Sequence, residues 1–150
     1  MSPFWLGSKF EFTRSISSKQ KGSFGEKFVA AVMKDMGFDV SRRYSSDHDI
    51  VVNGMSAEVK MSTAWDNKKD AFKWQQIRNQ DYKLIFFLGI NPNDFTIWWA
   101  TKDQLNEKVI GKDEYRQHAG KDGNQELYWI SCRQEWFNDL SELKSVIGKL

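Results

Sequence analysis

Apolar positions recur with helical spacing early in the chain and with the shorter spacing of strands further on. A helix is predicted over residues 24–36, where one apolar face is formed by Phe28, Val29, Val32, Met33 and Met36. Ser23 and Glu26 have the spacing of a capping box at its start, and Gly37 is a natural stop. The polar residues 14–22 before it are predicted to be a mobile loop.

Strand-like runs follow this helix at residues 38–44, 48–52 and 55–61. The last two flank Asn53-Gly54, and this pair is typical of a two-residue turn in a β-hairpin. In that register Asp49 lies opposite Glu58, and Asp47 lies opposite Lys60. Asp49, Glu58 and Lys60 then share one face, because side chains alternate between the faces of a sheet.

The second half of the chain predicts further helices and strands. A second helix is predicted over residues 71–80, and it contains Phe72, Trp74 and Ile77. Thr101 and Gln104 predict a capped helix ending near residue 109. The remaining predicted elements are a buried strand over 82–90, a strand over 95–100, a polar loop over 111–124, a strand over 125–131 and a helix over 138–147. We therefore expect one α/β domain over residues 1–150, with a central mixed β-sheet flanked by helices.

Composition sets the class of protein and little else. The chain has 150 residues, 28% of them charged and 40% hydrophobic, as in a compact globular domain. The single cysteine, Cys132, excludes a disulfide within this sequence and indicates a reducing, cytoplasmic setting. The sequence offers no secretory signal and no membrane span. Residues 1–46 carry eight basic and four acidic side chains, so a polyanion would dock there most readily, although an ordinary solvated surface is the alternative.

The predicted pair of carboxylates is the feature that points to chemistry. Like charges directly opposite each other destabilise a sheet, so Asp49 and Glu58 require a bound cation or a raised pKa on one of them. Mg²⁺ is commonly held by one or two carboxylates together with substrate phosphates. Lys60 beside them can hold a phosphate oxygen or orient a water. The set is suited to metal-assisted hydrolysis of a phosphodiester.

The spacing Asp49…Glu58-Val-Lys60 resembles the D…ExK signature of the PD-(D/E)XK, or restriction-endonuclease-like, nucleases. The resemblance covers residues 22–100, implies an αβββαβ core, and leaves residues 101–150 to complete the domain. It implies that Asp49, Glu58 and the Val59 carbonyl bind the metal, and that Lys60 positions or deprotonates the attacking water. It further implies that Glu26 reaches toward the metal, that Gln75 or Gln76, preferably Gln76, contributes from the next helix, and that Ser62 contacts the phosphate region.

Each of these assignments has an alternative. Lys60 can instead form a cross-strand ion pair with Asp47, and Glu26 can serve only as a helix cap. Five basic residues are equally consistent with contacts to nucleic acid and with ordinary surface charges: Arg42, Arg43, Lys68, Lys69 and Lys73. Core packing is the more common role of Trp98, Trp99, Trp129 and Trp136, although such rings can also stack on bases. His48 is predicted to face the core, and His118 with Cys132 forms no supported catalytic pair.

From the residues and the resemblance together, we expect a Mg²⁺-dependent endodeoxyribonuclease that also accepts Mn²⁺ and needs no organic cofactor. Restriction-type cleavage of duplex DNA by a homodimer is the first hypothesis, because cutting two strands is a two-fold symmetric task. A Holliday-junction or other structure-specific nuclease is the alternative. A non-catalytic nucleic-acid-binding module is the alternative from another class of protein.

Overall fold

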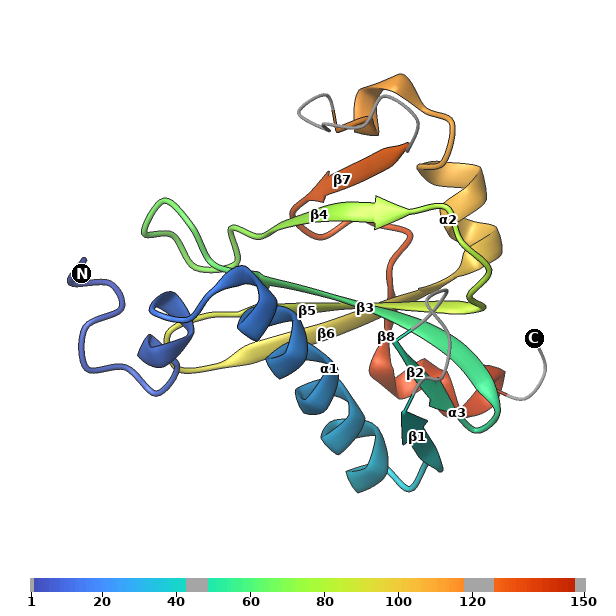
Figure 1. Cartoon of the computed structure of the whole chain (residues 1–150), viewed down its shortest axis with the longest axis horizontal. Helices are drawn as coiled ribbons and strands as arrows, with labels where there is room; N and C mark the ends of the chain where they lie inside the picture. Colours follow the sequence, from blue (N-terminus) through green and yellow to red (C-terminus); the bar gives the residue numbers. More distant parts are fainter. Residues whose placement is uncertain (1, 43–48, 118–125, 148–150) are drawn as a thin grey trace.

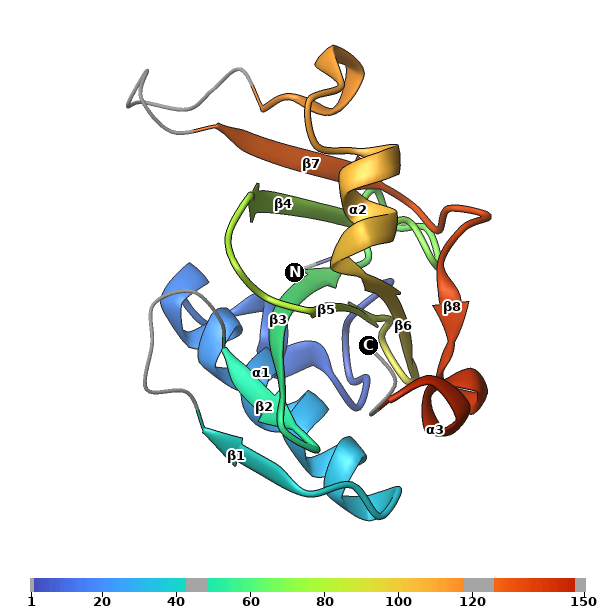
Figure 2. The same ribbon diagram turned by 90° about the vertical axis from the view of Figure 1, so that its right-hand side faces the viewer.

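The computed structural model describes residues 2–42, 49–117 and 126–147 and shows a mixed α/β arrangement in layers (Figure 1). A six-stranded sheet has the order β1-β2-β3-β5-β6-β8, and a two-stranded sheet pairs β4 with β7. The strands are β1 (Val40–Arg42), β2 (Ile50–Val52), β3 (Met55–Thr63), β4 (Lys73–Arg78), β5 (Leu84–Ile90), β6 (Phe95–Thr101), β7 (Leu127–Ser131) and β8 (Asn138–Asp139). Helix α1 (Ser18–Asp35) covers one face of the large sheet, and β4 with β7 covers the other (Figure 2). Both faces of the central strands are therefore buried.

The predicted hairpin is confirmed in its register. Val52 pairs with Met55 and Ile50 with Ala57, so β2 and β3 turn at Asn53-Gly54. Both turn residues have positive φ, 47° for Asn53 and 82° for Gly54, as the tight hairpin turn requires. The pairing continues through a backbone hydrogen bond of 2.9 Å from Asp49 N to Ala57 O. Asp49 and Glu58 therefore lie side by side, as predicted.

Helix α1 begins earlier than the sequence pattern suggested. A capping box joins Ser17 and Gln20, whereas the predicted box of Ser23 and Glu26 is wrong because both residues lie inside the helix. The predicted loop over 14–22 is wrong over most of its length, because residues 18–22 form the first turns of α1 and Arg14 ends a 3-10 turn, η1 (Glu11–Arg14). Gly25 is buried where α1 packs closely against β3, and a Cβ there would lie 3.0 Å from the Cβ of Met61.

The helix predicted over 71–80 is wrong, and this segment forms strand β4 instead. Trp74 and Ile77 are both buried and pair with β7, but the register shifts between them. Gln76 has φ 55° at this β-bulge. One extra residue in the strand widens the spacing of the buried positions from two to three, which imitates a helix. The αβββαβ order is corrected accordingly, since β4 stands where the second helix was expected.

The strand β5 is buried along its whole length and pairs in parallel with β3 and antiparallel with β6. The predicted capping box of Thr101 and Gln104 is confirmed at the start of α2 (Lys102–Lys108), and a 3-10 turn η2 (Asp113–Tyr115) follows. The predicted C-terminal helix over 138–147 is wrong at its start. Strand β8 covers the edge of β6 there, before a 3-10 turn η3 (Leu140–Glu142) and a short α3 (Leu143–Val146).

Among the helices of the described residues, none combines the length and the apolar character needed to cross a bilayer.

Candidate functional site

The carboxylate pair lies in a pocket of about 390 Å³ between α1, the β2–β3 hairpin and β4. We call it the carboxylate pocket; its described lining residues are Lys19, Gly22, Ser23, Glu26, Asp49, Glu58, Val59, Lys60 and Arg78. Asp49 Oδ2 accepts a hydrogen bond of 2.8 Å from Val59 N. The N–H and C=O of one strand residue point to the same edge, so the Val59 carbonyl also faces the Asp49 side. The three predicted metal-binding groups are thus brought together.

Glu58 is fully buried, and its two carboxylate oxygens have different surroundings. Oε2 lies 3.4 Å from a guanidinium nitrogen of Arg78 and 3.6 Å from Lys60 Nζ. Oε1 is buried and accepts no hydrogen bond from any described residue. Burial raises the pKa of the Glu58 carboxyl; the cations Lys60 and Arg78 act against this rise, and the Asp49 carboxylate adds to it. One oxygen is therefore compensated by cations, and the other is left for a proton or a bound cation.

Lys60 is held in place from β4; the predicted alternative partner, Asp47, lies outside the described residues. Lys60 Nζ donates a hydrogen bond of 2.8 Å to the backbone carbonyl of Gln76. The β-bulge at Gln76 is itself tied down, since Gln76 N donates a bond of 2.8 Å to Gln117 Oε1. Gln76 was predicted to contribute a side chain from a helix. The structure instead shows its strand backbone positioning Lys60.

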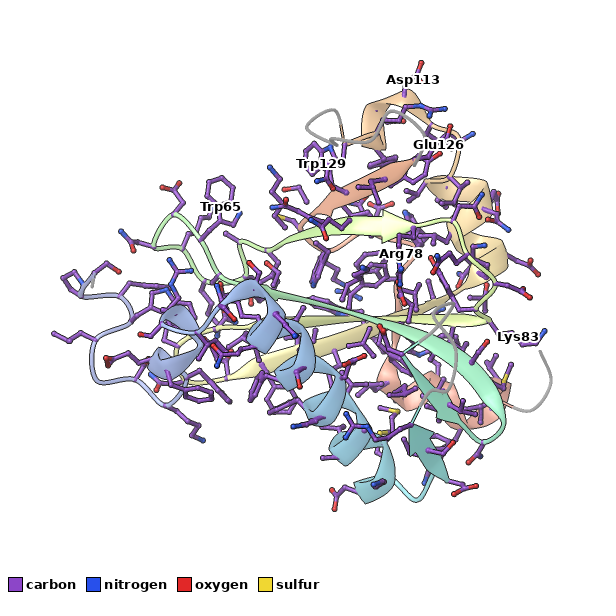
Figure 3. All side chains as sticks on the ribbon, in the orientation of Figure 1. Trp65, Arg78, Lys83, Asp113, Glu126 and Trp129 are labelled. Atoms are coloured by element: carbon purple, nitrogen blue, oxygen red, sulfur yellow. The ribbon has the colours of Figure 1, made fainter. Side chains whose placement is uncertain are left out.

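Arg78 is the site residue that sequence reasoning missed. It lies on β4, and its side chain is 27% exposed and enters the space between β4 and β3 (Figure 3). Tyr82 Oη donates a hydrogen bond of 2.6 Å to the Arg78 carbonyl and holds this end of the strand. Because the segment was interpreted as a helix, no signal in the sequence placed Arg78 opposite Glu58. Recognition of the bulge was needed first.

Glu26 reaches the carboxylate pocket from the middle of α1 and is half-buried there. It also lines a second pocket of about 330 Å³, together with Asp49 and Arg42. Within the part of the chain that the structure describes, no three His, Cys, Asp or Glu side chains converge as metal ligands. Glu26 thus borders the site without completing a three-carboxylate cluster.

A second depression, of about 570 Å³, adjoins the carboxylate pocket and shares Gly22, Val59 and Lys60 with it. We call it the basic groove; its described lining also includes Arg14, Ser18, Lys21, Met61, Ser62, Thr63, Trp65, Lys73, Gln75 and Gln76. Of the predicted nucleic-acid contacts, Ser62 and Lys73 lie in it. Ser62 Oγ accepts a bond of 2.9 Å from Lys73 N, so this hydroxyl also joins β3 to β4.

The other predicted contact residues are scattered. Lys68 and Lys69 lie on the exposed loop after β3, outside the described lining of the groove, and Lys69 is 3.3 Å from Asp94. Arg42 lines the pocket beside Glu26. The predictions for Arg43, His48 and His118 concern positions outside the described residues. Trp99 is buried and Trp98 packs against the core, as the core-packing alternative expects.

Comparison of the chain with protein-family models and with curated proteins gave no match. Among solved structures, it is similar to a bacterial homing endonuclease, I-Ssp6803I, at 15% sequence identity. That likeness covers 79% of this chain and 78% of the other, with a TM-score of 0.49. A likeness of this degree does not assign the chain an activity.

The chemistry of the donor groups fits a hard divalent ion. Asp49 and Glu58 offer carboxylate oxygens, the Val59 carbonyl faces the same side, and Glu58 Oε1 is a buried acceptor with no hydrogen-bond donor among the described residues. Mg²⁺ is usually bound by one or two carboxylates and completes its coordination with water and phosphate oxygens. The absence of a third described carboxylate at the centre is therefore compatible with Mg²⁺.

Proposed function

We propose that this chain is a divalent-metal-dependent DNA endonuclease of the PD-(D/E)XK type. The observation that carries the proposal is the buried Glu58 carboxylate, which has cations on Oε2 and no described hydrogen-bond donor on Oε1, beside Asp49. Two carboxylates side by side in a pocket repel each other, so the pair requires a bound cation or a proton on Glu58. A bound Mg²⁺ or Mn²⁺ would remove that repulsion.

Asp49, Glu58 and the Val59 carbonyl would hold the metal ion. When bound, the ion would supply Lewis-acid stabilisation of the negative charge that develops on the phosphate. Asp49 has a further task in the protein itself, since its bond to Val59 N holds the β2 end against β3. The carboxylate is thus oriented by the backbone before any ligand arrives.

Lys60 is placed to handle the attacking water. Its ammonium group has three hydrogen-bond donors, of which one is directed at the Gln76 carbonyl and another is near Glu58 Oε2. The remaining donor is available to orient a water molecule or a phosphate oxygen in the pocket. Arg78 is partly exposed beside it, so its guanidinium can contribute positive charge toward the same phosphate.

Restriction-type cleavage of duplex DNA by a homodimer is our first proposal for the biological reaction. Structure-specific cleavage is the second, and the exposed aromatic ring of Trp65 in the basic groove favours it. A non-catalytic binding module of the same fold has no use for a buried carboxylate pair beside a lysine. A cleavage assay separates this alternative from both proposals, because a binding module would bind DNA without cutting it.

The test compares wild type with Lys60→Ala on plasmid DNA in buffers containing Mg²⁺, Mn²⁺ or EDTA. We expect cleavage by wild type with either metal and a fall of about 10²–10³-fold in Lys60→Ala, as for loss of one group that stabilises the transition state. Lys83→Gln is the control, because Lys83 is exposed and lies at the far edge of the molecule from Trp65 (Figure 3). Equal nicking by wild type and Lys60→Ala, or none by wild type with any substrate, would contradict the proposal.

A further inference from the structure

The basic groove gathers positive charge, and among its described cations Lys60 is the one that forms an ion pair, with Glu58. Four cationic side chains line it, Arg14, Lys21, Lys60 and Lys73, and its described lining contains no carboxylate. Among the described residues, no Asp or Glu lies within ion-pair distance of Arg14, Lys21 or Lys73. Burial lowers the pKa of Lys21, and the nearby Arg14 lowers it further. A fold that keeps these cations together is suited to bind an anion.

The arrangement of the groove favours an extended anion rather than a small one. Arg14 is anchored by a bond of 3.0 Å from its guanidinium to Thr63 Oγ1 and lies over the ring of Trp5. Lys73 lies over the ring of Trp129, 4.6 Å from its centre, on the other wall. Lys60 stands at the inner end, where the groove opens into the carboxylate pocket. Cations spaced along an open path match the phosphates of a nucleic-acid strand.

Trp65 supplies an interaction of a different kind. Its side chain is 49% exposed, and it stands on the loop after β3 with Trp129 on the neighbouring sheet (Figure 3). The loop is pinned, because the buried Asn91 accepts a bond of 2.9 Å from Asp70 N and donates one of 2.8 Å to Asp70 Oδ1. The exposed ring of Trp65 therefore stands on a loop that hydrogen bonds hold in place. Aromatic side chains presented in this way stack on unpaired bases.

We infer that the basic groove binds a single-stranded DNA segment adjoining the cut site, with its phosphates on Arg14, Lys21 and Lys73 and one base stacked on Trp65. A base inside a duplex is already stacked on both sides, so only an unpaired base can reach the ring. The inference rests on the proposed function, because it takes the carboxylate pocket as the cut site. Its substrate class is DNA with a single-stranded branch or tail.

The test measures binding by fluorescence anisotropy in EDTA, where no cleavage occurs. The probes are a blunt duplex and the same duplex with a single-stranded tail of about 8 nucleotides, within the range of known single-strand sites. We expect wild type to bind the tailed duplex more tightly. Trp65→Leu should weaken tailed binding by about 5- to 150-fold and leave blunt binding unchanged, as expected for loss of one stacked base. Trp65→Phe keeps a ring and should retain most of the preference.

The contribution of charge is tested with the double variant Lys21→Gln and Lys73→Gln. Arg14 is left in place because its guanidinium also donates a hydrogen bond to Thr63, and its removal would disturb the fold. We expect the slope of log affinity against log salt to fall by about 0.7 for each phosphate of the single strand that the variant no longer neutralises. Lys83→Gln is the matched control for one lysine at an exposed site and should leave the slope unchanged.

Equal affinity of wild type for blunt and tailed probes, or no effect of Trp65→Leu, would overturn the inference. The outcome is separable from that of the proposed function. Tail-dependent binding without metal-dependent cleavage supports the groove and removes the nuclease. Cleavage without any tail preference supports the nuclease and removes the groove.

Discussion

The carboxylate pocket and the basic groove share Gly22, Val59 and Lys60, yet their charges follow opposite rules. Among the described residues of the pocket, three carboxylates face three cations, Lys19, Lys60 and Arg78, so charge is balanced locally. In the groove Lys60 is paired with Glu58, and Arg14, Lys21 and Lys73 form no ion pair with a described carboxylate. The pocket is suited to hold a small cation and a reacting group, whereas the groove needs a polyanion to be neutral. Lys60 belongs to both and marks where a bound strand would pass into the pocket.

The largest effect is expected from Asp49→Asn, which should separate cleavage in the carboxylate pocket from binding in the basic groove. Asparagine can still accept the bond from Val59 N, so the hairpin is kept while the negative charge is lost. We expect cleavage in Mg²⁺ to fall by roughly 10²-fold or more, and binding to tailed DNA in EDTA to stay at the wild-type level. Single-turnover cleavage and anisotropy measure the two effects. Loss of binding together with cleavage would show that pocket and groove are not separate.

Both depressions depend on β4 packing against the large sheet, and Gly89→Ala tests that support. A Cβ on Gly89 would collide with the ring of Phe72, which is fully buried just before β4. Overpacking of this kind costs about 1–3 kcal/mol, and we expect the upper end because ring and strand are both enclosed. Thermal unfolding measures the loss. An unchanged melting temperature would mean that β4 sits less tightly than the structure shows.

Arg78→Ala probes the compensation of Glu58 within the pocket. The variant leaves Glu58 Oε2 with Lys60 alone, and we expect a loss of about 1–2 kcal/mol in EDTA, reduced from the value for a fully buried pair because Arg78 is 27% exposed. Chemical denaturation measures it. The double variant Glu58→Gln with Arg78→Ala should lose less than the sum of the single changes, because a neutral side chain needs no cation. Full additivity would show that the two residues do not interact.

The smallest effect concerns a region that borders neither depression. Glu126 accepts hydrogen bonds from Tyr128 Oη at 2.6 Å and from Arg116 at 2.7 Å, and these bonds lower the pKa of the Glu126 carboxyl. The lowered pKa stabilises the folded protein at pH values above about 4.5, the ordinary pKa of a glutamate carboxyl. This stability is lost as the pH falls through the pKa that Glu126 has in the folded protein. Glu126→Gln should remove this part of the fall in melting temperature at acid pH. An unaltered pH profile of the melting temperature would contradict this role.

The sequence predicted those features that depend on local chemistry. Asn53-Gly54 set the hairpin and its register, which placed Asp49 beside Glu58, with Lys60 two residues further along the same strand. The caps of α2 and the buried β5 followed from equally local patterns. These predictions needed only alternation, turn preference and capping.

Features that depend on partners distant in the chain were not predictable. The bulge at Gln76 imitated helical spacing, and only the pairing of β4 with β7 makes the segment a strand. The position of Arg78 beside Glu58 and the hydrogen bond that holds Lys60 both depend on this strand, so neither was predictable. The early start of α1 at Ser18 was hidden as well, because residues 18–22 are polar and show no apolar face. Residues 138–139 form a strand because they cover the edge of β6, which no local pattern reveals.

The carboxylate pocket is proposed to hydrolyse DNA with a divalent ion. Single-turnover cleavage of a tailed duplex by excess wild-type protein tests it most directly, first in EDTA and then after addition of Mg²⁺ or Mn²⁺. We predict no cleavage in EDTA, cleavage on addition of either metal, and a rate at least about 10²-fold lower in Asp49→Asn with either ion. A rate in EDTA equal to that in Mg²⁺, or an equal rate in wild type and Asp49→Asn, would contradict the account.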